Sequence, residues 1–173
     1  AIEKHMLAYV QKTGWQAFVE HVKENDPTTY NTIGKRDVAL EELTHTDHRL
    51  LDNTPNDDEK VNLVRLAGLL EQVKIAVGGK PVMVNSAFRS KAVNDAVGSK
   101  DTSQYRLGCA ADIRVPGMTP DEVVRAIIKS GIGYDQVIRE FDRWTHVSIP
   151  NLSTGTPRKQ ALIIDKQGTR AFA

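Results

Sequence analysis

Hydrophobic residues recur at helical spacing in two long segments of the chain. From Glu3 to Glu24 they return every three or four positions, and the pattern stops near Asp26-Pro27. We predict one amphipathic helix or two short ones there, packed against its own domain or docked on a partner protein. Residues 61–77 are apolar nearly all round. A helix of this kind must be buried on more than one side, so we predict that it forms the centre of the core.

Short apolar runs and turn residues fill most of the chain after that helix. Thr119 is placed to cap a helix that runs to Ser130 and ends at Gly131, because Pro120 follows it and Glu122 completes a capping box. Apolar runs predict short strands, over residues 82–84, 110–115, 136–139, 145–149 and 161–165. The fold class is therefore predicted to be α+β, with a mostly antiparallel sheet and packed helices.

The length of 173 residues allows one domain of ordinary size and one extra element. We predict a helical extension and linker over residues 1–37 and a single domain over residues 38–173. The composition, 40% hydrophobic and 26% charged with a net charge of +1, gives no electrostatic field that would attract nucleic acid or a membrane surface. No apolar run is long enough to span a membrane and no signal peptide is recognised, so we expect synthesis in the cytoplasm.

Three isolated residues have metal-binding or nucleophilic chemistry. The single cysteine, Cys109, excludes an internal disulfide and a zinc site built from several cysteines. We interpret it as a small buried side chain, since no histidine lies beside it in the sequence. His45 and His48 would suit a metal if they lay on a helix. We interpret both as residues of a surface loop, because no third ligand lies nearby.

Three motifs follow one another in the second half of the chain, and their order and spacing carry a family resemblance. They are Val84-Asn85-Ser86-Ala87-Phe88-Arg89-Ser90, then Ser103-Gln104-Tyr105-Arg106-Leu107-Gly108-Cys109-Ala110-Ala111-Asp112, then Trp144-Thr145-His146-Val147-Ser148. From residue 38 to residue 150 the chain resembles the zinc D-Ala-D-Ala carboxypeptidases and phage peptidoglycan endolysins, whose signature is S-x-H-x-x-G-x-A-x-D followed by a W-x-H or W-H element. The resemblance implies a D-Ala-D-Ala carboxypeptidase-like fold and, in its active members, zinc-dependent cleavage of peptidoglycan peptides.

The resemblance also implies three zinc ligands, and one of them is changed in this chain. Asp112 and His146 match the second and third ligands, whereas Tyr105 stands where the first histidine belongs. In the family, three ligands leave a fourth position for the water that attacks the peptide bond. Tyrosine ligates a metal only as phenolate, and its usual pKa of about 10 opposes deprotonation at neutral pH. We therefore expect a degenerate site without a cofactor, with zinc as the metal if the chain is active.

A second departure concerns the general base. Many relatives carry an acidic residue three positions before the last histidine, and Arg143 occupies that position here. A guanidinium cannot accept a proton, and its charge would repel a nearby metal. Glu140 and Asp142 are the remaining acidic residues, and a hairpin turn over residues 141–143 would return Glu140 toward His146. Glu140 is thus the candidate catalytic residue.

Two further positions match residues that hold the substrate in the resembling enzymes. Arg89 corresponds to an arginine that holds a substrate carboxylate or carbonyl group. A salt bridge from Arg89 to Asp112 or to another core acid stays open as the alternative. Ser103 corresponds to a serine that holds the end of the substrate, and for this residue we favour a role in capping its own loop.

The two departures favour a catalytically inactive relative. We expect a binding or structural component of a larger assembly such as a phage particle, made in the bacterial cytoplasm. Its expected partners are peptidoglycan peptide and, through the N-terminal helix, other proteins of the assembly. The alternative is an active zinc-dependent carboxypeptidase or endolysin. It would use Asp112, His146 and the Tyr105 phenolate, or a histidine from elsewhere such as His45 or His48.

Overall fold

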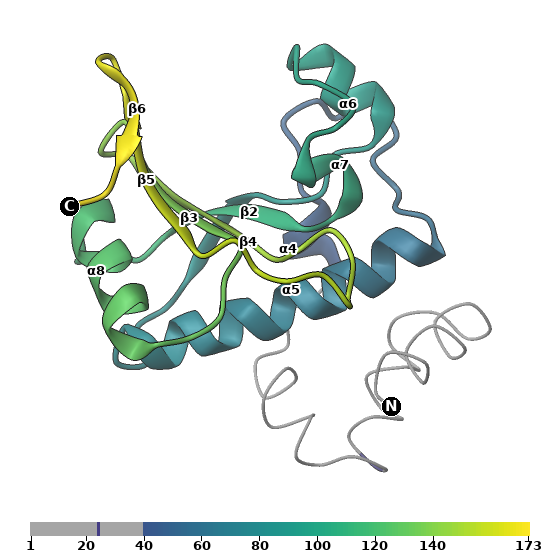
Figure 1. Cartoon of the computed structure of the whole chain (residues 1–173). Helices are drawn as coiled ribbons and strands as arrows, with labels where there is room; N and C mark the ends of the chain where they lie inside the picture. Colours follow the sequence, from purple (N-terminus) through teal and green to yellow (C-terminus); the bar gives the residue numbers. More distant parts are fainter. Residues whose placement is uncertain (1–23, 25–39) are drawn as a thin grey trace.

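A computed structural model describes Glu24 and residues 40–173 of the chain (Figure 1). The predicted N-terminal helix, apart from Glu24, and the linker after it lie outside the described residues, as does the predicted boundary at residue 37. The described domain begins with the short helix α4 (Leu40–Thr44).

Six strands form one sheet in the order β1-β2-β4-β3-β5-β6. Four of the strand pairs are antiparallel, and β3 pairs with β5 in parallel. The predicted α+β class with a mostly antiparallel sheet is therefore confirmed. The strands are β1 (Met83–Ser86), β2 (Ala110–Arg114), β3 (Gln136–Glu140), β4 (Trp144–Ser148), β5 (Gln160–Asp165) and β6 (Gly168–Ala171).

The long helix α5 (Asp57–Ala76) passes beneath the sheet in Figure 1. It begins at Asp57 rather than at the predicted Val61, because Asn56 caps it and Glu59 completes a capping box. The prediction that this helix is buried on several sides is confirmed. Its buried residues are Glu59, Leu63, Val64, Leu66, Ala67, Gly68, Leu69, Leu70, Glu71 and Val73.

Helix α8 (Pro120–Ser130) packs against α5, β3 and β4. Its start and end are those that the sequence predicted. Thr119 caps the first turn together with Glu122, and Gly131 ends the helix with a left-handed φ of 74°. Two short helices, α6 (Lys91–Ala96) and α7 (Gln104–Leu107), lie at the other end of the sheet (Figure 1).

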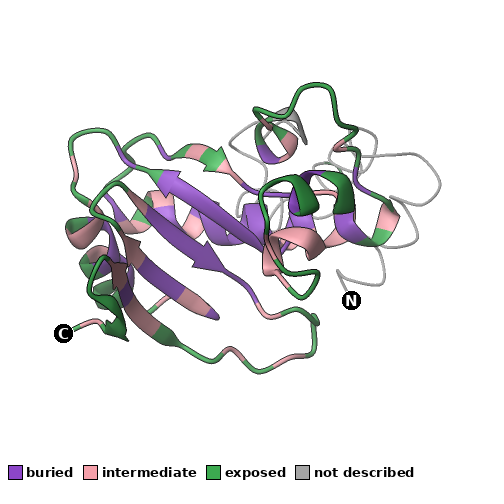
Figure 2. Ribbon diagram, turned by 90° about the horizontal axis from the view of Figure 1, so that it is seen from above, coloured by how far each residue is buried: buried purple, intermediate pink, exposed green. Residues whose placement is uncertain are grey.

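Alternation along the strands gives the sheet two different faces. Ala111, Val137 and Val147 belong to the apolar core that the helices share. Asp112 directly follows Ala111, and His146 directly precedes Val147, so both lie on the opposite face. They are nevertheless only 8% and 6% exposed, because β2 and β4 are buried along most of their length (Figure 2). The second face therefore holds buried polar groups. Among the described residues, no helix has the length and apolar character needed to cross a membrane.

Candidate site between the sheet and helix α7

Asp112 on β2 and His146 on β4 are paired directly across two antiparallel strands. Directly opposed residues point to the same face, so strand register alone brings these side chains together. Glu140 pairs with Trp144, two positions before His146, and therefore lies on that face as well. Carboxylate oxygens of Asp112 and Glu140 and a ring nitrogen of His146 lie within 4.8 Å of one another. Their spacing is that of a possible metal site.

Tyr105 enters the site from helix α7. Ser103 caps this helix, and its Oγ accepts a hydrogen bond from the Tyr105 backbone N at 3.3 Å. The helix ends at Gly108, whose φ is 78° and whose position leaves no room for a side chain. A Cβ there would lie 3.0 Å from the Glu59 carbonyl oxygen and 3.1 Å from Leu63 Cγ. Glycine meets both demands, so this turn fixes where α7 lies on α5.

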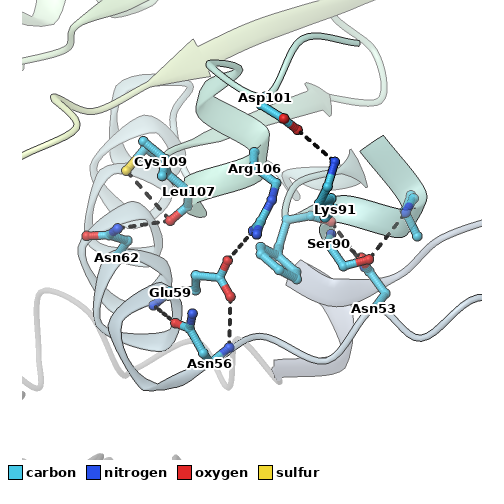
Figure 3. A network of polar contacts seen from close by, with 12 residues as sticks. Asn53, Asn56, Glu59, Asn62, Ser90, Lys91, Asp101, Arg106, Leu107 and Cys109 are labelled. Atoms are coloured by element: carbon cyan, nitrogen blue, oxygen red, sulfur yellow. Dashed lines mark hydrogen bonds and ion pairs between the residues drawn. The ribbon is translucent and has the colours of Figure 1, made fainter. Parts of the chain in front are cut away.

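A polar network fastens α7 to α5 (Figure 3). Arg106 Nη1 donates to Glu59 Oε2 at 2.5 Å, and the Glu59 side chain is 11% exposed. Asn62 Nδ2 donates to the carbonyl oxygen of Leu107 at 2.9 Å. These contacts join two consecutive residues of α7 to the first turns of α5. They hold the backbone of Tyr105 in place relative to the core.

The turn before α5 holds the Arg89 segment in a similar way. Asn53 Nδ2 donates to the carbonyl oxygen of Phe88 at 3.1 Å, and Asn53 Oδ1 accepts from the backbone N of Ser90 at 2.7 Å. Figure 3 shows Asn53 next to Ser90. The backbone N of Arg89 donates to the carbonyl oxygen of Tyr105 at 3.0 Å. The first two motifs are thereby joined through their backbones.

The Tyr105 hydroxyl sits between Asp112 and His146. Its oxygen is hydrogen-bonded to Asp112 Oδ1 and lies 2.7 Å from His146 Nδ1, and those two atoms are 3.3 Å apart. A phenol has one proton to donate, and the carboxylate is the stronger acceptor. The Tyr105 hydroxyl therefore donates its hydrogen bond to Asp112. Nδ1 of His146 then carries a proton of its own and donates it to the phenol oxygen. In this arrangement Nδ1 has no lone pair for a metal.

Burial raises the pKa of the Tyr105 phenol well above its usual 10.0, and the negative charge of Asp112 raises it further. Glu140 acts in the same direction, whereas Arg89 opposes the shift. The cause is that a phenolate would add another negative charge to a buried cluster that already holds carboxylates. Without a bound metal, Tyr105 is therefore a phenol at neutral pH.

Glu140 reaches the site from the end of β3, as the predicted hairpin turn over residues 141–143 requires. Trp144 Nε1 donates to Glu140 Oε2 at 3.0 Å. Burial raises the pKa of the Glu140 carboxyl, and the charge of Asp112 adds to the effect. Arg143 lies exposed in the turn, where its backbone N donates to the Glu140 carbonyl oxygen at 3.0 Å. The acidic group beside His146 is thus that of Glu140, the candidate that the sequence indicated.

Arg89 stacks on the ring of Tyr105. Its Cζ atom lies 4.1 Å from the ring centroid, in the geometry of a cation–π contact. Within the described part of the chain Arg89 forms no salt bridge, so the alternative of an ion pair with Asp112 is not observed. The guanidinium is half-buried and held over the ring. Its planar fork is thereby positioned next to Tyr105.

The other residues with candidate chemistry lie apart from this cluster. His45 and His48 are exposed, and His45 Nε2 is 3.7 Å from a carboxylate oxygen of Asp47. Neither histidine belongs to the possible metal site found among the described residues. Cys109 is fully buried, and burial raises the pKa of its thiol to about 11. It is a protonated packing side chain, as its sequence context predicted.

A second polar cluster supports Tyr105, and the sequence did not reveal it. Gln104 Nε2 donates to Asp135 Oδ2 at 3.0 Å, and Arg158 Nη2 pairs with the same carboxylate at 2.6 Å. Asp135 is only 3% exposed. The hydrogen bonds from Arg158 hold the pKa of the Asp135 carboxyl below its usual range. The three residues are far apart in the sequence, so their contact could not be predicted from it. The one sequence signal for this cluster is that Gln104 directly precedes Tyr105.

A family model described as Peptidase M15 matches residues 38–148. This chain belongs to the peptidase M15 family, the zinc D-Ala-D-Ala carboxypeptidase-like family that its motifs resemble. The matched region contains every residue of the cluster around Tyr105. A comparison with curated proteins finds no match.

Zinc is the metal of this family, and the residues present fit it only in part. The 3.3 Å between Asp112 Oδ1 and His146 Nδ1 suits two neighbouring ligands of a tetrahedral zinc ion, whose bonds are about 2.0–2.2 Å long. However, the Tyr105 hydroxyl is hydrogen-bonded to both atoms, in the space where the ion would lie. Tyrosine is longer than histidine, so it reaches beyond the position of a ligand atom. With Tyr105 protonated, this set of residues does not fit a zinc ion.

Proposed function

We propose that this domain binds peptidoglycan peptides without cleaving them. The observation that carries the proposal is the Tyr105 hydroxyl, which is hydrogen-bonded to Asp112 and lies 2.7 Å from His146 Nδ1. It engages the two groups that would otherwise hold the catalytic zinc. Without that ion no water is activated for attack on a peptide bond. Membership of the peptidase M15 family supports a peptidoglycan peptide as the ligand.

Arg89 supports the binding part of the proposal. Its guanidinium is held 4.1 Å over the ring of Tyr105, and no described acid forms a salt bridge with it. A planar guanidinium suits a carboxylate, and a side chain that is already ordered loses less entropy when a ligand binds. We assign Arg89 to a carboxylate or carbonyl group of the peptide. Ser103 remains a candidate contact for the peptide end, alongside its role as the cap of α7.

The test uses a synthetic peptide that ends in D-Ala-D-Ala. Calorimetry measures its binding, and mass spectrometry follows release of D-Ala with zinc added. The unmodified chain is expected to bind the peptide and to release no D-Ala. Arg89→Gln is expected to weaken binding by about tenfold or more, because a hydrogen bond to a charged group is lost. Lys129→Gln removes an exposed charge from α8 and serves as the control, with unchanged binding. Failure of the unmodified chain to bind would contradict the proposal.

An active zinc peptidase is the second candidate function. It is favoured by the spacing of Asp112, Glu140 and His146, whose possible ligand atoms lie within 4.8 Å of one another. In this case Tyr105 would swing out of the site and Glu140 would replace it as the third ligand. Zinc-dependent release of D-Ala, lost in Glu140→Gln, distinguishes this function from binding alone.

We propose further that the domain serves in a larger assembly such as a phage particle. The support is the amphipathic pattern of residues 3–24, which lie before the matched region. Mass spectrometry of phage particles from the producing organism tests this. Peptides of this chain in purified particles, reduced in amount by Trp15→Ser, are the expected result, and their absence would count against it.

A further inference from the structure

A pocket of about 510 Å³ lies between two hairpin turns at one end of the sheet. Phe141, Arg143 and Trp144 line it from the β3–β4 turn, and Lys166 and Gln167 line it from the β5–β6 turn. The two turns are neighbours because β3 and β5 pair in parallel. Figure 1 shows the β5–β6 hairpin rising at the C-terminal end of the chain. We call this cavity the turn pocket.

The β3–β4 turn has a backbone conformation that is uncommon for its residues. Phe141 and Asp142 have φ values of 51° and 52°, and a 3.0 Å hydrogen bond from Arg143 N to Glu140 O closes the turn. Left-handed residues at both central positions define a type I′ turn, which favours asparagine and glycine. A bulky aromatic residue is strained there. Phe141 is nevertheless 44% exposed, so part of its ring is available to a ligand.

The charges in the turn pocket are unbalanced. Asp142 pairs at 3.1 Å with Arg139, which also pairs with Asp121 at 3.0 Å, and Asp165 pairs with Arg170 at 2.8 Å, so both carboxylates have a cationic partner. Arg143 and Lys166 are exposed, and no described residue forms a salt bridge with either. The turn pocket therefore presents two uncompensated positive charges next to the rings of Phe141 and Trp144. Those rings lie 6.0 Å apart, centroid to centroid.

Trp144 connects the turn pocket to the site around Tyr105. Its ring lines the turn pocket, and its Nε1 donates to Glu140 Oε2 at 3.0 Å. Glu140 in turn lies with Asp112 and His146. A peptide held near Arg89 and Tyr105 that continued past Trp144 would enter the turn pocket. An acidic residue of that peptide would meet Arg143 and Lys166 there.

We propose that the turn pocket is a second binding subsite, which takes an acidic residue of the peptide. The carboxylate lies between Arg143 and Lys166, and the aliphatic part of the residue packs on Phe141 and Trp144. This inference rests on the proposed function, since both subsites hold one peptide. It adds a preference for acidic peptides that the site around Tyr105 does not create by itself.

The test compares two synthetic pentapeptides ending in D-Ala-D-Ala, one with a glutamate in the middle and one with glutamine in its place. Calorimetry on the full chain is expected to show the glutamate peptide binding about three- to tenfold more tightly, as two partly exposed ion pairs allow. Added salt should reduce the difference, because it screens exposed charges. Arg143→Gln combined with Lys166→Gln should abolish it. Lys129→Gln should leave it unchanged.

Phe141→Asn tests the contribution of the Phe141 ring to binding. The variant is expected to fold, because asparagine suits the left-handed conformation better than phenylalanine does. Weaker binding of both peptides is expected. Equal binding of the two peptides by the unmodified chain would overturn the subsite and leave the proposed function standing. A preference for the glutamate peptide that persists in the variant with both Arg143→Gln and Lys166→Gln would also overturn the subsite and leave the proposed function standing. Binding of neither peptide would overturn both proposals.

Discussion

The hydroxyl oxygen of Tyr105 lies 2.7 Å from Nδ1 of His146 and is hydrogen-bonded to Asp112 on its other side. Two residues that match the zinc ligands of the resembling enzymes are here joined by a phenol. Burial and the charge of Asp112 keep that phenol protonated. The sheet, helix α7 and Arg89 surround it. The phenol therefore lies at the centre of the site that the sequence motifs form.

Tyr105→Phe removes one oxygen atom from the centre of the site. We predict a loss of about 1–3 kcal/mol in the free energy of unfolding, because the buried Asp112 carboxylate and His146 lose a hydrogen-bond partner. Urea denaturation measures the change. Tyr134→Phe is the matched control, since Tyr134 also packs against the core and its hydroxyl has no hydrogen bond among the described residues. Equal losses in the two variants would show that the Tyr105 hydroxyl contributes nothing special.

Gly108→Ala should be more destabilising than the same change at Gly131. Both glycines have a left-handed φ, but only at Gly108 would a Cβ meet a backbone oxygen, that of Glu59, at 3.0 Å. We predict a cost of about 1 kcal/mol at Gly131 from backbone strain alone, and about 2–4 kcal/mol at Gly108 from strain and crowding together. Thermal or urea unfolding of the two variants gives the comparison. If Gly108→Ala is no worse than Gly131→Ala, α7 does not lie on α5 as described.

Asp135 should make the domain sensitive to acid. Hydrogen bonds from Arg158 lower the pKa of its carboxyl below the usual 3.8, so its stabilising effect is fully present above that value. The effect is lost as the pH falls through the lower pKa of the folded state. We predict that unfolding free energy drops more steeply between about pH 5 and pH 2 in the unmodified chain than in Asp135→Asn. Asp47→Asn, at a side chain that is 99% exposed, should keep the steep profile. An unchanged slope in Asp135→Asn would disprove the assignment.

Tyr105→His should restore affinity for zinc. Histidine is shorter and offers a lone pair without deprotonation, so it would free the space between Asp112 and His146 and supply the missing ligand. We predict zinc binding at least about tenfold tighter than in the unmodified chain, measured by calorimetry at neutral pH. Tyr105→Phe frees the space without adding a ligand and separates the two effects. A histidine variant that binds no more zinc than its parent would mean that Tyr105 does not occupy the position of the lost ligand.

Local signals in the sequence predicted helices α5 and α8 well. The capping box of Thr119 and Glu122 and the stop at Gly131 fix both ends of α8, because these interactions involve residues close together in the chain. The apolar character of residues 61–77 predicted the buried helix α5. Only its first turn was missed, although the cap at Asn56 falls within a cluster of turn residues that the sequence displays.

Features that depend on distant contacts were predicted less well. Strand β6 was not predicted, since all of its residues are exposed and carry no apolar alternation. The place of Arg89 over Tyr105 depends on how two motif loops pack, and no spacing in the sequence determines it. Glu140 was suggested by the hairpin, but the acidic position was first sought at Arg143. A count of positions along the chain does not report which residues of a turn face the site.

Zinc content of the purified, unmodified chain is the decisive quantity, measured by elemental analysis after equilibration with zinc at neutral pH. A phenol that fills the space between Asp112 and His146 predicts far less than one zinc ion per chain, with no change in His146→Ala. One zinc ion per chain that disappears in His146→Ala would contradict the loss of the metal site and favour an active peptidase.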